Sequence, residues 1–302
     1  MRIDRPHRVG LIAGSGRFPI LFAEAAARQG NQVVCAGIKG EADETLRDIC
    51  QAFYWTGIAK LGRMIRIFRR EGIERVVMAG KVHKAAMFSP WRWVRFLPDW
   101  RMIHMWYTYA KENKKDDTLL LAIIREFERD GIRFDSALQY CPDLLARKGC
   151  LTQRTPTSSE RDDIAFGWQL AKEMGRLDVG QSVAVKEGAV LAVEAIEGTD
   201  RMVLRAGYLC CNRGFTVVKV AKPQQDPRFD VPTIGTDTIE SLRMAGGKVL
   251  AIEAGSTIVI DPPKLIELAN RYRMTVVALD EHGDWAKEES LSPSSSARVF
   301  AA

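Results

Sequence analysis

The sequence predicts an α/β protein of two domains, residues 1–135 and residues 136–281. Its 302 residues are more than one hydrophobic core comfortably serves. Short β-branched runs alternate with helical patterns in both halves, which is the order typical of parallel sheets. A loose stretch rich in Pro, Gly, Ser and Thr lies between residues 131 and 160 and separates the halves. We expect a ligand cleft between the two domains, which is a common place for a ligand.

The first elements form a β-α-β pattern: a strand at residues 8–13, a helix at 20–29 and a strand at 32–38. They predict a Rossmann-like N-terminal domain. Gly14 and Gly16, followed by Arg17, lie in the first turn, where glycines let a ligand phosphate approach the backbone. Pro19 replaces the third glycine of a dinucleotide fingerprint, and no acidic residue ends the second strand, so NAD binding is disfavoured. A purely structural turn and another anionic ligand remain as alternatives.

A predicted strand at residues 75–79 ends beside Lys81, which can meet a phosphate or simply lie in solvent. Asp116 and Asp117 open a helix predicted at 118–129, where capping alone explains them, and substrate binding is the alternative. Between them, residues 88–109 hold eight aromatic side chains: Phe88, Trp91, Trp93, Phe96, Trp100, Trp106, Tyr107 and Tyr109. Basic residues interleave with these rings from 81 to 115. The combination suits single-stranded nucleic acid, a membrane surface or an anionic amphiphile, unless it only packs internally.

The second half continues with strands predicted at residues 182–185 and 189–194, joined by a hairpin. Glu194, Glu197 and Asp200 follow within seven residues, either as a solvated loop or as carboxylates neutralised by cations or a metal. Strands at 249–253 and 257–260 are expected to pair with each other. A helix at 263–272 and a strand at 275–279 close the domain, and residues 282–302 are expected to form a disordered tail.

The stretch from 217 to 240 joins a strand to a helix through a polar segment that carries Asp226, Arg228 and Asp230. Lys219 and Lys222 lie just before it. Open α/β sheets bind ligands where strands end and helices begin, because unpaired N–H groups gather there. An ordinary strand–turn–helix connection is the alternative.

Composition narrows the classes of function that the protein can have. A net charge of +6 and a pI of about 9.0 favour an anionic partner. Six cysteines without a C-x-x-C pair and four scattered histidines exclude zinc-site spacing and predict reduced thiols in a cytoplasmic protein. We see neither a signal peptide nor an apolar run long enough to span a membrane.

No nucleophile elbow, P-loop or histidine dyad is apparent, so a carboxylate with a divalent cation is the economical way to activate water on a phosphate. Two hypotheses follow. One is a metal-assisted hydrolase of a phosphoester or phosphoanhydride in an amphiphile. The other is a non-enzymatic binder of an anionic lipid or nucleic acid through residues 81–115.

Six motifs together resemble one family: LIAGSGRFP (11–19), MAGKV (78–82), DDTLL (116–120), DVGQSVAV (178–185), VLAVEAIEGTD (190–200) and KPQQDPRFDVPTIGTDTI (222–239). The chain resembles the LpxI-type UDP-2,3-diacylglucosamine pyrophosphatases of bacterial lipid A synthesis. The resemblance implies cytoplasmic, Mg²⁺-dependent hydrolysis of UDP-2,3-diacylglucosamine to 2,3-diacylglucosamine 1-phosphate (lipid X) and UMP. It further implies no nucleic-acid partner. Peripheral contact with the inner membrane and a homodimer stay open.

The resemblance also implies roles for single residues. It places the catalytic carboxylate on Asp230, with Asp226 as the second choice. As a hypothesis of mechanism, Mg²⁺ is held by Glu194, Asp200 or Asp226. The residues expected to bind substrate are Gly14, Gly16, Arg17, Lys81, Asp116, Asp117, Gln181, Thr199, Lys219, Lys222, Arg228, Thr233, Gly235 and Thr236.

Overall fold

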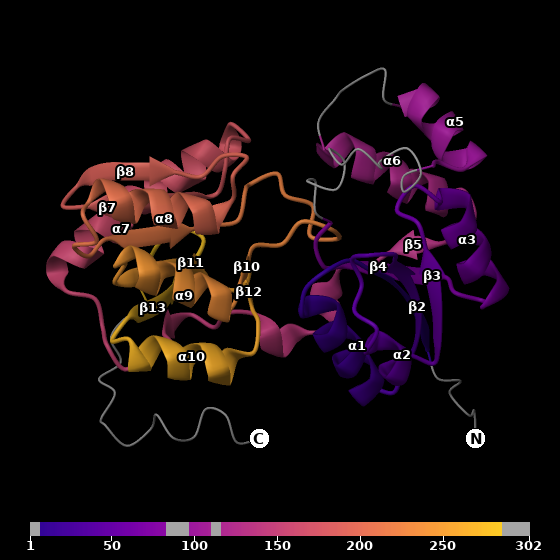
Figure 1. Ribbon diagram of the computed structural model, residues 1–302, viewed down its shortest axis with the longest axis horizontal. Helices are drawn as coiled ribbons and strands as arrows, with labels where there is room; N and C mark the ends of the chain where they lie inside the picture. The colour runs from indigo at the N-terminus through magenta and orange to yellow at the C-terminus, as the bar shows by residue number, and fades with distance from the viewer. Residues whose placement is uncertain (1–6, 83–96, 110–115, 286–302) are drawn as a thin grey trace. The chain divides into compact units, whose positions relative to one another are not determined.

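The computed structural model describes residues 7–82, 97–109 and 116–285, which form two compact units (Figure 1). Unit 1 combines the chain up to Asp143 with the short segment Asp226–Asp230. Unit 2 combines Leu144–Gln225 with the chain from Val231 onward. The division at Asp143 lies beyond the boundary expected at 135, because two short 3₁₀ turns, Ala137–Gln139 and Pro142–Leu144, still follow the last strand of unit 1.

Unit 1 is built on a parallel sheet of five strands in the order β3-β2-β1-β4-β5, which confirms the predicted parallel-sheet domain. The strands are β1 (Arg8–Ala13), β2 (Gln32–Ile38), β3 (Ala52–Thr56), β4 (Arg75–Ala79) and β5 (Arg133–Phe134). The helices are α1 (Phe18–Arg28), α2 (Leu46–Ile49), α3 (Leu61–Arg70), α5 (Trp100–Tyr109) and α6 (Asp116–Glu128). After their first residues, Arg8 and Gln32, the central strands β1 and β2 are apolar and buried, because helices cover both faces of such a sheet.

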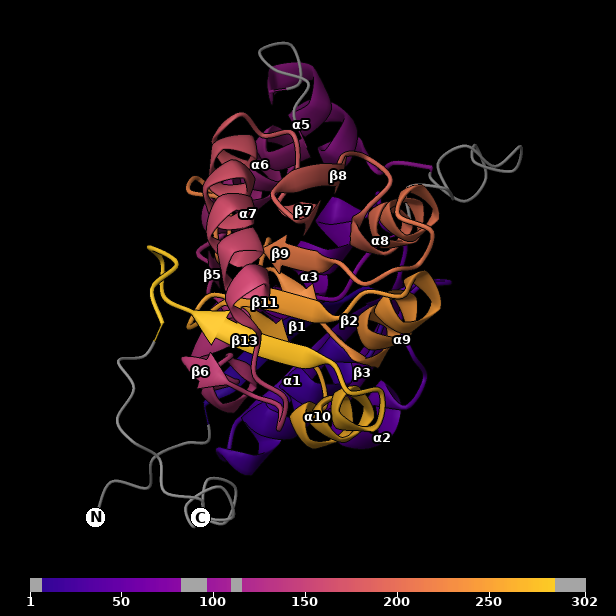
Figure 2. The ribbon, with the colours of Figure 1, turned by 90° about the vertical axis from the view of Figure 1, so that its left-hand side faces the viewer.

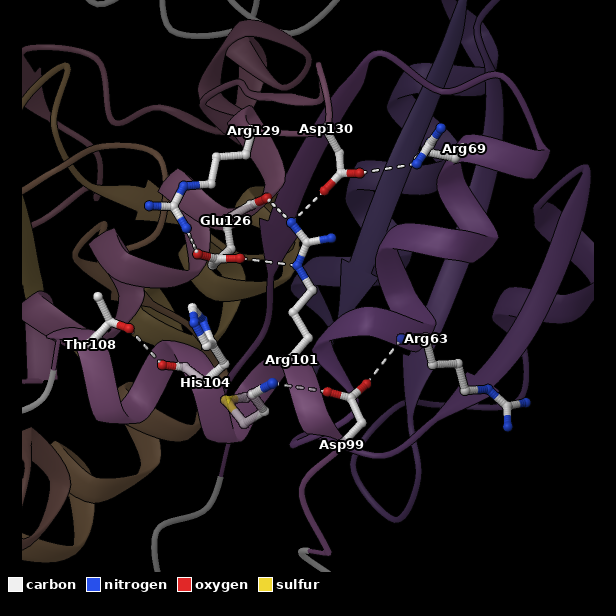
Figure 3. A network of polar contacts seen from close by, with 10 residues as sticks. Arg63, Arg69, Asp99, Arg101, His104, Thr108, Glu126, Arg129 and Asp130 are labelled. Carbon is white, nitrogen blue, oxygen red and sulfur yellow. Dashed lines mark hydrogen bonds and ion pairs between the residues drawn. The ribbon is translucent and has the colours of Figure 1, made fainter.

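Helices α3, α5 and α6 share one core with the sheet, in which Phe68, Met105 and Phe127 are fully buried. A polar network fixes α5 in place (Figure 3). Arg101 on α5 contacts Glu126 of α6 through its Nε at 3.0 Å, and its guanidinium also pairs with Asp130. The Asp99 carboxylate accepts backbone N–H bonds from Met102 of α5 and Arg63 of α3, and so caps the first turns of two helices at once.

Unit 2 holds a mixed sheet of six strands in the order β6-β13-β11-β9-β7-β8, together with a separate parallel pair, β10 and β12. The strands are β6 (Gly149–Cys150), β7 (Ser182–Lys186), β8 (Ala189–Val193), β9 (Thr216–Lys219), β10 (Thr233–Ile234), β11 (Val249–Glu253), β12 (Ile258–Val259) and β13 (Thr275–Leu279). The helices are α7 (Ser158–Arg176), α8 (Thr199–Leu209), α9 (Thr236–Ala245) and α10 (Pro262–Arg271). Helix α7 covers one face of the large sheet, and α8, α9 and α10 cover the other (Figure 2).

Two expectations for unit 2 are wrong. The chain at 257–260 does not pair with β11; β12 pairs with β10, because the N–H of Ile258 donates to the carbonyl of Pro232 and that of Ile260 to Ile234. Residues 282–285 do not belong to a structureless tail. Trp285 packs against the core under α7, and the guanidinium of Arg161 lies 5.0 Å from its ring centre. The rest of the expected tail, residues 286–302, lies outside the described residues.

The segment Asp226–Asp230 is the main surprise of the fold, because it lies far along the chain from the rest of unit 1. The Ser136 hydroxyl donates to the carbonyl of Pro227 at 2.7 Å, and Phe229 packs against the core beneath α6. Arg228 lies 3.7 Å from Glu128 at the end of α6. The polar stretch singled out in the sequence is therefore a short insertion of the second half of the chain into unit 1.

Candidate functional site

Asp226 organises the turn that carries the segment Asp226–Asp230. Its carbonyl accepts the N–H groups of Phe229 and Asp230, and its side chain accepts the N–H of Arg228 at 3.0 Å. The Arg228 guanidinium donates hydrogen bonds to both carboxylate oxygens of Asp226, the shortest of them 2.6 Å long. These hydrogen bonds from the Arg228 side chain hold the pKa of Asp226 below its usual value. The geometry gives both residues a structural task in shaping the turn.

Asp230 closes the same turn with a different environment. Its N–H is bound by Asp226, whereas its carboxylate makes no hydrogen bond or ion pair to any residue in the described part of the chain. The side chain is partly exposed. Of the two aspartates predicted for catalysis, Asp230 is thus the one with a carboxylate available to water or substrate.

Replacing Asp226 by asparagine is expected to reduce stability at neutral pH by about 1 kcal/mol. A carboxylate whose pKa is lowered by folding stabilises above its unfolded pKa of about 3.9 and loses that contribution as the pH falls through the lower folded value. The difference between parent and variant should therefore shrink below about pH 4. Urea unfolding at pH 7, 5 and 3 measures it, and Asp237→Asn, at an exposed position of α9, is the control. A difference that stays constant with pH contradicts the assignment.

A buried polar cluster in unit 2 brings together three residues that the sequence had suggested separately. Lys219 at the end of β9 donates to the Thr199 hydroxyl at 2.7 Å, and that hydroxyl donates to Glu194 at 2.9 Å. Ser182 lies 3.4 Å from the same hydroxyl. Both charged side chains are almost fully buried, Glu194 being 7% exposed and Lys219 6%. We call these four residues the Glu194 cluster.

The Glu194 cluster leaves one carboxylate oxygen unused. Glu194 Oε2 is buried and has no hydrogen-bond partner among the described residues. A buried anionic oxygen without a partner is costly, so it marks a point where a ligand donor, a cation or a water completes the arrangement. The cluster also lies where β8 ends and α8 begins, with Gly198 as an N-cap that offers no side chain. The first-turn N–H groups of α8 therefore have no side-chain cap.

Other predicted residues of unit 2 fall into several environments. Lys222 pairs with Asp178 at 2.8 Å, and Gln181 has a buried amide oxygen without a partner in the described chain. Asp200 is exposed in the first turn of α8. Thr233 lies in β10, and Gly235 caps α9 ahead of Thr236 without a side-chain bond. Helices α8 and α9 both follow an N-cap glycine and start with Thr-Asp, so the tripeptide Gly-Thr-Asp marks the start of each.

Packing and backbone conformation explain most of the glycines in the turn after β1. A side chain on Gly14 would lie 2.5 Å from the carbonyl of Lys81, because the turn after β1 pairs with the backbone that follows β4. Gly16 has a φ of 95°, in the left-handed region that glycine tolerates. Lys81 and Arg17 stay exposed at this edge. Asp116 and Asp117 are the first two residues of α6, and their side chains lie outside the described part.

Sequence reasoning missed a second buried carboxylate in unit 2. Glu253, the last residue of β11, is 4% exposed and accepts from Lys172 of α7 at 2.7 Å and from the N–H of Ala221 at 2.8 Å. It therefore fixes the start of the connection that leads to Asp226. The available signal was an apolar strand, VLAIE, that ends on a carboxylate.

The fold and these polar groups define a class: a two-unit α/β protein with carboxylates and lysines gathered at strand ends and helix starts. Two family models match the chain, the LpxI N-terminal domain over residues 8–144 and the LpxI C-terminal domain over residues 147–277. The UDP-2,3-diacylglucosamine pyrophosphatase LpxI of Caulobacter vibrioides is 32% identical over 283 residues, which cover 90% of this chain and 98% of that protein. The chain belongs to the LpxI family, as its motifs predicted.

Proposed function

We propose that this protein hydrolyses the pyrophosphate of UDP-2,3-diacylglucosamine to give lipid X and UMP. The observation that carries the proposal is the match to a pyrophosphatase of that name over almost the whole of both chains. The partly exposed Asp230 carboxylate supplies the group that such a reaction needs. The alternative, a non-enzymatic binder acting through residues 81–115, gains no support from the comparisons.

Each polar group has a task in this proposal. Asp230 orients the attacking water and accepts its proton, because its carboxylate is not held by Arg228 as that of Asp226 is. Lys219 and Lys222 supply positive charge for the phosphates at the ends of the strands of unit 2. The N–H groups at the starts of α8 and α9 suit the same anion, since neither helix has a capping side chain.

The proposal includes Mg²⁺. No group of three or more acidic, histidine or cysteine side chains gathers within the described residues. Mg²⁺ nevertheless commonly uses one or two carboxylates and takes its other ligands from water and substrate phosphates. The unpartnered Oε2 of Glu194 and the exposed Asp200 fit that donor set. The ion would neutralise charge on the pyrophosphate.

Removal of divalent cations with EDTA is expected to lower turnover at least about 100-fold, and added Mg²⁺ is expected to restore it. Glu194→Gln and Asp200→Asn should each weaken cation binding, which can be followed with Mn²⁺ by electron paramagnetic resonance. Asp237→Asn is the control, since it removes a carboxylate from the first turn of the neighbouring helix. Unchanged Mn²⁺ binding in both test variants rejects these ligands, whatever the activity.

The function itself is tested by incubating the purified protein with UDP-2,3-diacylglucosamine and following UMP and lipid X by mass spectrometry. Equal amounts of both products are expected. UDP-N-acetylglucosamine, which has no fatty acyl chains, serves as the control substrate and should be hydrolysed far more slowly. If the parent releases UMP no faster than a sample without protein, the proposal fails.

A further inference from the structure

Helix α5 presents an apolar face that the other described residues leave exposed. Trp100, Ile103, Trp106 and Tyr107 are 79%, 37%, 56% and 69% exposed. With 100° between successive residues, these four side chains share one side of the helix. Met105 faces the opposite way and is fully buried. We call these four residues the α5 face.

The α5 face is held on a rigid support. The carboxylate of Asp99 binds the first turn of α5, while Arg101 joins it to Glu126 and Asp130 behind the helix (Figure 3). Exposed tryptophans on a helix secured in this way are costly in water. No described helix is long and apolar enough to cross a bilayer.

Positive charge lies beside the first turn of α5. Arg63 and Arg66 on α3 are exposed, and neither guanidinium has an ion-pair partner among the described residues. Asp99 links their helix to α5, because its carboxylate lies 3.1 Å from the N–H of Arg63. The guanidinium of Arg63 extends away from the ion-pair network (Figure 3).

Aromatic side chains on one helix face with arginines beside them suit the surface of an anionic bilayer. Tryptophan and tyrosine settle at the level of the lipid headgroups, and arginine pairs with lipid phosphates. Nucleic acid fits less well, because single-stranded bases need flat platforms in a basic groove, and Ile103 occupies the middle of this face.

We propose that the α5 face, with Arg63 and Arg66, docks the protein on an anionic membrane surface. Only the purpose of docking rests on the proposed function: an enzyme with a diacylated substrate meets that substrate more often when it is bound to the membrane. Docking itself needs no substrate, so it can be measured separately from hydrolysis.

The test is cosedimentation of the full-length protein with vesicles of phosphatidylcholine, with and without phosphatidylglycerol. The parent should bind the vesicles with phosphatidylglycerol at least tenfold more strongly. Trp100→Ser combined with Trp106→Ser should weaken that binding at least tenfold. Arg63→Gln combined with Arg66→Gln should remove most of the preference for phosphatidylglycerol.

Two control variants remove matched groups from unit 2. Tyr208→Ser with Met244→Ser removes comparable exposed apolar side chains, and Arg176→Gln with Arg271→Gln removes the same charge. Both should bind vesicles as the parent does. Circular dichroism checks that all variants fold.

The proposal is overturned if the parent does not bind vesicles, or if the tryptophan variant binds them equally well. It is also overturned if the parent binds a single-stranded oligonucleotide in preference to vesicles. If the tryptophan substitutions change only the oligomeric state, measured by light scattering, the α5 face binds a second copy of the chain. That result likewise overturns the docking proposal. Hydrolysis of substrate dispersed in detergent should be equal in parent and tryptophan variant, so a failure of docking and a failure of the proposed function are distinguishable.

Discussion

Replacement of Asp230 by asparagine is expected to lower the turnover of UDP-2,3-diacylglucosamine by about 10³-fold while leaving the fold intact. The carboxylate of Asp230 makes no bond to the described residues, so its loss removes no structural contact. Asparagine keeps the size and the backbone N–H that binds the carbonyl of Asp226. It cannot accept a proton from water.

The measurement is single-turnover hydrolysis together with substrate binding and urea unfolding. Binding and the unfolding midpoint should match those of the parent. Asp237→Asn, with the same chemical change on the exposed first turn of α9, should keep full activity. Parental turnover in the Asp230 variant would reassign the catalytic carboxylate.

Replacement of Lys219 by methionine is expected to reduce the stability of unit 2 by about 3 kcal/mol. Methionine fills a similar volume but carries no charge. The buried carboxylate of Glu194 then loses the nearby ammonium group, to which it is linked through the Thr199 hydroxyl. An uncompensated buried charge costs more than the loss of the pair as a whole. Activity should fall as well, because the same lysine is proposed to face the phosphates.

The double variant, Lys219→Met with Glu194→Gln, separates the two effects. Removing both charges should restore most of the lost stability, and hydrolysis should remain impaired. Lys248→Met is the control, because Lys248 is an exposed lysine just before β11. Stability of the double variant equal to that of the lysine variant alone would show that the Glu194 cluster is not coupled as described.

The sheets and helices of both units follow from local patterns. Apolar runs of about five residues with β-branched side chains gave the central strands, and the amphipathic spacing of α3 gave its buried face. Helix α7 begins at Ser158, whereas the sequence pattern predicted a helix over 163–175. Its Thr157 and Glu160 form a capping box three residues apart, a pattern that marks the true start of the helix in the sequence.

The candidate site was predictable only in part. Glu194 and Lys219 were noted at strand ends, Thr199 was named after the family resemblance, and the fold joined all three. The hairpin of β7 with β8 was predicted, but the joining of the three residues also depends on the antiparallel pairing of β7 with β9, which no local pattern specifies. Glu253 was missed for the same reason, since its bond to Ala221 follows from β9 lying beside β11.

The insertion of Asp226–Asp230 into unit 1 means that the polypeptide passes between the units three times rather than once. A cut after Asp143 therefore leaves five residues of unit 1 on the C-terminal fragment. An N-terminal fragment ending at Asp143 lacks Phe229, which packs on its core, and the C-terminal fragment carries that ring with no core to bury it. Separate expression of the two halves is therefore expected to expose Phe229 on one fragment and part of the unit 1 core on the other.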